Sequence, residues 1–169
     1  MKINTKTIAV NGVVAALYIA LTLLCYPFSF LGIQFRFAEI LVLFCFFNPK
    51  LTIGVTFGCV VANFASELGP IDALFGGLAT LASCLIVSFC KHLFIAGIFP
   101  ILINAFVVGA ELYFILKVNF WINVGTVALG EFAVMVVGVI LLTILRKRNK
   151  KFFELIGATR NLPITNKVE

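Results

Sequence analysis

Long apolar runs separated by short polar breaks recur along the whole chain. Because a bilayer core of about 30 Å takes about 20 helical residues, these runs have the scale of membrane spans. Charged residues, proline and asparagine divide the chain into six predicted spans, over residues 7–25, 36–47, 51–65, 71–90, 94–116 and 120–145. The second and third are short, which implies tilted helices or a recessed end that leaves a cavity.

The pattern contains no alternation typical of strands. Helices and closed barrels are the only structures that satisfy the backbone within lipid, so we expect an all-α integral membrane protein. The predicted fold is a single six-helix bundle over residues 1–169, ending in a short basic tail from residue 146. The composition agrees, with 62% hydrophobic and 12% charged residues.

A polar group of residues stands at the mouth of the second span. Gln34, Arg36 and Glu39 supply an amide, a guanidinium and a carboxylate there, and the last two share one helix face because they are three residues apart. Charged groups in such an apolar chain persist only in water, in a protein pocket or as pairs. Two interpretations stay open: a binding site, or a salt bridge that caps a helix at the membrane surface.

The segment 26–32 connects the first two spans and is unusual in composition. It is too apolar for a solvent-exposed loop, and Pro27 and Gly32 break any helix. We expect it to fold back as a lid over the cavity.

The basic residues predict the orientation in the membrane. With both termini in the cytoplasm, 11 of the 13 lysine and arginine residues lie inside, and only Arg36 and Lys117 lie outside. The basic tail then serves as a topology and lipid-surface signal, and nucleic-acid binding is not expected.

The acidic residues are distributed in the opposite way. Five of them fall in the outer half or the outer loops: Glu39, Glu67, Asp72, Glu111 and Glu131. From a rise of 1.5 Å per residue, Glu131 lies about 16 Å into the last span and Glu111 about 9 Å below the outer surface. Carboxylates at such depth mark functional sites that face the bundle interior. We therefore predict a polar pocket that opens outward.

Small residues form two stripes with a spacing of four. Gly12, Ala16 and Ala20 lie on the first span, and Gly54, Gly58 and Ala62 lie on the third. Such stripes let helices approach closely in lipid. Each is either an internal packing seam or a surface for another membrane subunit.

Residues suited to catalysis are few. The histidine, His92, stands beside Lys91 at a predicted cytoplasmic turn, and the five cysteines have no metal-binding spacing. Motifs for phosphate binding, zinc hydrolysis or nucleophilic attack are absent from the sequence. An ATP-driven process would need another chain, and the remaining enzymatic hypothesis is an intramembrane reaction with Glu111 and Glu131 as acid and base.

Several motifs resemble the QueT family, most closely between Ala15 and Ala79. They are AALYIALT (15–22), IQFR (33–36), FFNPK (46–50), GVTFGC (54–59), Ala62-Asn63, DALFG (72–76) and LGEF (129–132). The resemblance implies a substrate-binding S-component of an energy-coupling-factor (ECF) transporter in the cell membrane of a prokaryote. Such a subunit is not itself an enzyme. It captures a micronutrient outside and docks on a transmembrane scaffold protein bound to two cytoplasmic ATPases, which hold the ATP and Mg²⁺. The family's first-helix Ala-x-x-x-Ala docking motif matches Ala16 and Ala20, and Gly12 extends it.

The cargo that the resemblance implies is a queuosine precursor, a 7-deazaguanine. Its ring N–H and amino donors suit one carboxylate, Glu131 or Glu111, in a bidentate pair. Its aminomethyl cation suits Glu39 and Asp72. Further hydrogen bonds are expected from Asn63 and Gln34, and stacking from Trp121, Tyr113 or a lid phenylalanine.

Other readings stay open at this stage. Some proteins that resemble the family carry cobalamin, which would need a wide, mostly apolar mouth. The alternatives of another class are a small intramembrane enzyme and a stand-alone channel or scaffold. The sequence shows no ring of like polar residues that could line a channel.

Overall fold

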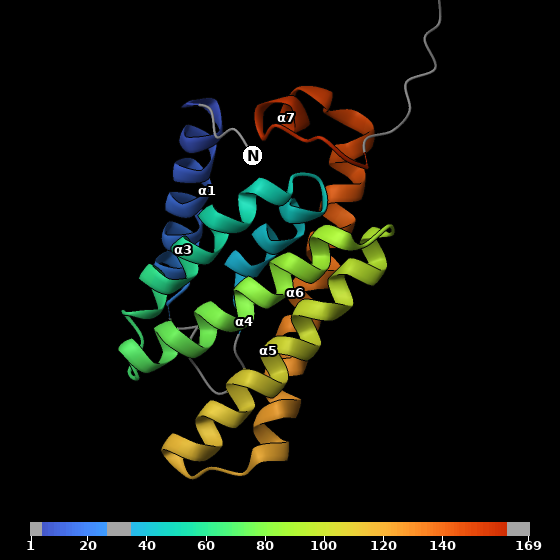
Figure 1. Ribbon diagram of the computed structural model, residues 1–169. Coiled ribbons are helices and arrows are strands. Elements are labelled where there is room, and N and C mark those ends of the chain that lie inside the picture. The colour runs from blue at the N-terminus through green and yellow to red at the C-terminus, as the bar shows by residue number, and fades with distance from the viewer. Residues whose placement is uncertain (1–4, 27–34, 162–169) are drawn as a thin grey trace, which may run out of the picture.

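The computed structural model describes residues 5–26 and 35–161, and all regular secondary structure in this part of the chain is helical (Figure 1). The elements are α1 (Thr5–Leu24), the 3-10 helices η1 (Phe37–Phe46) and η2 (Pro49–Leu51), α3 (Thr52–Asn63), α4 (Pro70–Phe89), α5 (Leu93–Leu116), α6 (Phe120–Arg148) and α7 (Lys150–Leu155). The predicted lid covers residues 26–32, and all of it but Tyr26 lies outside the described residues. Gln34 also lies outside them.

Within the described residues, four helices are long and apolar enough to cross a membrane. They are α1, α4, α5 and α6, with 20, 20, 24 and 29 residues. The predicted spans 36–47 and 51–65 contain η1 and α3, which have 10 and 12 residues. The prediction of an all-α, multi-pass membrane protein is therefore confirmed, whereas six crossings and cytoplasmic termini remain predictions.

The short helix η1 lies inside the bundle. Eight of its ten residues are buried, and it contacts α1, α3, α4, α5 and α6. Leu43 and Cys45 have no solvent-exposed surface. Because other helices surround η1, the acidic residue in its first turn, Glu39, lies in the interior of the molecule.

The helices α1 and α3 pack through the glycines of α3. A Cβ added at Gly54 would lie 2.6 Å from the Asn11 carbonyl oxygen, and one at Gly58 would lie 2.8 Å from the Tyr18 Cβ. The Asn11 side chain also accepts a hydrogen bond from the Gly54 amide (2.7 Å). This stripe of small residues is thus an internal packing seam.

One end of the bundle is strongly basic. At this end, α7 folds back so that Phe153 is buried, and Asn48 Nδ2 donates to the Ile156 carbonyl (2.8 Å). The last turn of α6 at this end carries Arg146, Lys147 and Arg148. The opposite end, lowermost in Figure 1, contains the α3–α4 and α5–α6 turns.

Candidate functional site

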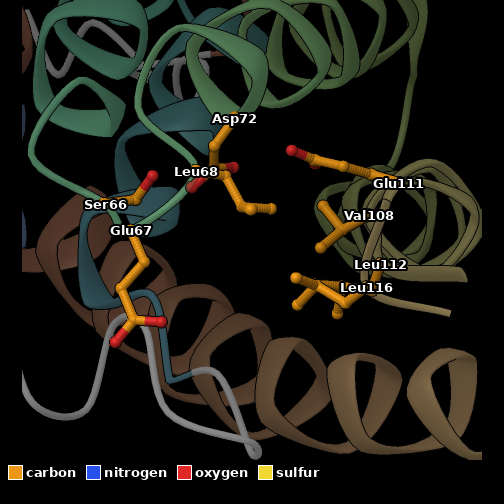
Figure 2. Close-up of a pocket in the computed structure, with 8 residues that line it drawn as sticks. All are labelled: Ser66, Glu67, Leu68, Asp72, Val108, Glu111, Leu112 and Leu116. Atoms are coloured by element: carbon orange, nitrogen blue, oxygen red, sulfur yellow. The ribbon is translucent and has the colours of Figure 1, made fainter. Parts of the chain in front are cut away.

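A pocket lies between the start of α4 and the last turns of α5 (Figure 2). The last turns of α5 lie at the end of the bundle away from α7 (Figure 1). Its cavity volume is about 70 Å³, and it is lined by Ser66, Glu67, Leu68, Asp72, Val108, Glu111, Leu112 and Leu116. One side is therefore polar, and the α5 side is apolar apart from Glu111.

Glu111 points its carboxylate from α5 across the pocket toward Asp72 (Figure 2). The residue is only 2% exposed, and neither carboxylate oxygen has a hydrogen-bond partner among the described residues. Asp72 repels this carboxylate, and Arg36 attracts it. A buried carboxylate in this state is costly, so a ligand that donates hydrogen bonds to it would be strongly favoured.

Asp72 is held in place by two contacts. The Arg36 guanidinium forms a buried ion pair with it, Nη2 to Oδ1, at 3.2 Å. The Asn63 side chain donates to the Asp72 backbone carbonyl (3.1 Å). Gly76 makes this arrangement possible, since a Cβ there would collide with the Asn63 amide nitrogen.

Behind this pair, Glu39 is fully buried within a hydrogen-bonded network. Its Oε1 accepts from the Tyr18 hydroxyl (2.5 Å) and from Thr80 Oγ1 (3.2 Å). The Thr80 hydroxyl also lies 3.1 Å from Cys59 Sγ. The network joins α1, η1, α3 and α4, so it fixes the carboxylate rather than leaving it free to follow a ligand.

Glu131 lies deeper in the bundle, on α6. Its Oε1 accepts from Asn104 Nδ2 (3.1 Å), and it interacts electrostatically with Glu39 and Arg36. It is 1% exposed and does not line the pocket.

The structure thus brings together five of the predicted site residues, in contact with the pocket or directly behind it: Arg36, Glu39, Asn63, Asp72 and Glu111. Tyr113 and Trp121 are not part of this group. They are 45% and 71% exposed and pack against Phe120 at the α5–α6 turn. Their predicted stacking on the cargo stays a prediction.

Other residues of the site were not predicted. Ser66 and Glu67 line the pocket, and Tyr18, Thr80 and Asn104 bond the buried carboxylates. Asn104 could have been predicted from the sequence, because an amide in the middle of an apolar span needs a polar partner.

The comparison with known protein families gives a clear match. The QueT transporter family matches residues 8–147. The chain belongs to this family. The queuosine precursor transporter QueT of Lactococcus lactis subsp. cremoris (strain MG1363) is 36% identical to the chain over 164 residues, which cover 87% of this chain and 96% of that protein. No solved structure matches the chain. The family is one of transporters, so the intramembrane-enzyme hypothesis is set aside.

Proposed function

We propose that this chain is the substrate-capturing subunit of an ECF-type importer and that its cargo is a queuosine precursor of the 7-deazaguanine class. The observation that carries the proposal is the buried Glu111 carboxylate, which faces the pocket with no hydrogen-bond partner among the described residues. The name of the Lactococcus lactis relative supports the same cargo.

Glu111 is the best candidate to read the edge of the base. Both of its oxygens are available, as a bidentate pair with the ring N–H and the amino group requires. Glu131 is less suitable, because Asn104 occupies one oxygen and the residue does not line the pocket. Glu131 and its amide partner fit a supporting role below the cargo.

The aminomethyl cation finds its acceptors on the α4 side of the pocket. Asp72 lines the pocket there, and its ion pair with Arg36 leaves room for a second partner on the carboxylate. The exposed Glu67 adds negative charge at the rim. Glu39 is a weaker candidate for this contact than expected from the sequence, because it lies behind the pocket among Tyr18 and Thr80.

The proposed topology has six crossings, with η1 and α3 as short inner spans and both termini in the cytoplasm. The strongly basic α6–α7 end supports this orientation. The pocket then opens outward, as an importer in the plasma membrane of a prokaryote requires.

A partner module would supply the energy. Gly12, Ala16 and Ala20 form an exposed stripe on α1, and no neighbouring atom of the described residues lies within 4 Å of a Cβ placed at Gly12. This open face suits docking on the ECF transmembrane scaffold protein, whose two ATPases hold ATP and Mg²⁺.

Uptake of labelled aminomethyl deazaguanine into cells that lack their own transporter tests the proposal. We expect accumulation when the chain is expressed with a scaffold protein and ATPases, and none with an ATPase variant that cannot hydrolyse ATP. Uptake that continues with that variant would contradict the importer proposal, and uptake of cobalamin alone would contradict the cargo.

A further inference from the structure

A basic cleft lies at the α4–α5 turn, at the end of the bundle opposite the candidate site. Four of the residues that line it carry basic side chains: Lys91, His92, Arg146 and Lys147. Leu93, Phe94 and Thr143 complete the lining, so none of the described residues that line it is acidic. The cavity volume is about 360 Å³, which is far more than a bound water or ion needs.

An apolar groove continues from this cleft along the outside of α5 and α6. Phe94 lines both cavities, and the groove runs on past Gly97, Ile98, Ile101, Phe132 and Val136. Its volume is about 260 Å³. Gly97 keeps its floor low, because a Cβ there would lie 3.1 Å from the Val139 side chain. From Phe94 to Ile101 the groove extends about 10 Å along the helix, into the depth of the acyl chains.

We propose that the cleft and groove together bind one anionic phospholipid. The phosphate lies among Lys91, Arg146 and Lys147, and one acyl chain fills the groove below Phe94. Basic pockets between transmembrane helices at headgroup level recognise anionic lipids in this way. The start of α5 adds to the attraction, since its N-cap, His92, makes no side-chain capping bond and the first amides of a helix carry partial positive charge.

This site differs from a general attraction of the basic tail to the membrane. Arg148, Lys150 and Lys151 belong to the same basic end but do not line the cleft. A tail attracted to any anionic surface would depend on its total charge. A cleft joined to a groove depends on particular side chains and on the acyl chain.

Native mass spectrometry of the delipidated, detergent-solubilised protein tests the proposal. Titration with dioleoyl phosphatidylglycerol is expected to give one retained lipid per chain, and dioleoyl phosphatidylcholine is expected to bind at least about tenfold more weakly. The double variant R146Q/K147Q should weaken phosphatidylglycerol binding by about thirtyfold, since each cation at the surface contributes roughly fivefold. The matched control R148Q/K150Q removes the same charge and should bind as the wild type does.

A second pair of variants tests the groove without changing the charge. Ile98→Trp fills the groove and should weaken binding, whereas Leu102→Trp, on an equally exposed position one turn further, should not. Equal loss in both double charge variants would overturn the proposal in favour of diffuse attraction. Equal binding of the two lipids, or displacement of the lipid by millimolar inorganic phosphate alone, would overturn it as well.

Discussion

Arg36 and Asp72 are 36 positions apart in the chain and form a buried ion pair, with Nη2 and Oδ1 3.2 Å apart and with side chains 4% and 7% exposed. The pair ties the start of η1 to the first turn of α4. Asp72 lines the pocket that Glu111 faces from the other side, and Arg36 holds Asp72 in place.

Removing one charge of this ion pair should destabilise the folded protein. Arg36→Gln leaves Asp72 as an uncompensated buried charge, and we expect it to lower the free energy of unfolding by roughly 3–5 kcal/mol. The double variant Arg36→Gln/Asp72→Asn removes both charges and should cost less than the single change. Thermal unfolding of the detergent-solubilised variants measures this, and strictly additive effects would show that the two side chains do not depend on each other.

Replacing Glu111 should separate binding from stability. Glu111→Gln loses a charge-assisted bond to the cargo, worth roughly 1.5–3 kcal/mol, so affinity should fall by about tenfold to a hundredfold. Its unfolding temperature should stay equal or rise, because the change removes a buried carboxylate to which none of the described residues donates a hydrogen bond. The control Glu154→Gln changes an exposed carboxyl at the opposite end and should leave both quantities unaltered. Normal affinity in Glu111→Gln would refute the role given to this residue.

A methyl group at Gly76 should disturb the pocket wall. In Gly76→Ala the new Cβ collides with the Asn63 amide and comes within 3.4 Å of both Arg36 and Asp72, so we expect lower stability and weaker cargo binding. Gly125→Ala is the matched control, because no neighbouring atom in the described part of the chain lies within 4 Å of a Cβ there, and alanine is the better helix former by about 1 kcal/mol. Calorimetric titration and thermal unfolding of both variants test this. Wild-type affinity and stability in both Gly76→Ala and Gly125→Ala would contradict a tightly packed pocket wall.

A larger side chain on the exposed face of α1 should block transport but not capture. Ala16→Leu is expected to abolish ATP-dependent uptake by preventing close helix approach, while cargo affinity stays at the wild-type value. Ala65→Leu, an equal change on the exposed turn after α3, should transport normally. If Ala16→Leu transports as well as Ala65→Leu, the stripe is not the docking face.

The helices could be predicted from sequence because their ends carry local signals. Pro70 begins α4, and Asn119 caps α6 by accepting from the Ile122 amide. Such signals act within one turn of a helix and need no knowledge of the fold. The predicted spans consequently agree with the helices to within three residues at each end.

The contacts of the site could be predicted only in part. The sequence predicted Glu111 as a site residue, but the pairing of Arg36 with Asp72 depends on how η1 packs against α4. The direction of Tyr113 follows from helix geometry. It stands two residues beyond Glu111, about 200° further around the helix, and therefore faces away from the pocket.

The central claim is that this chain binds a 7-deazaguanine through Glu111. Calorimetric titration of the purified wild-type protein with aminomethyl deazaguanine, and in parallel with cobalamin, tests it most directly. We expect tight one-to-one binding of the deazaguanine and no heat from cobalamin. Binding of cobalamin alone, or no binding of the deazaguanine by folded protein, would contradict it.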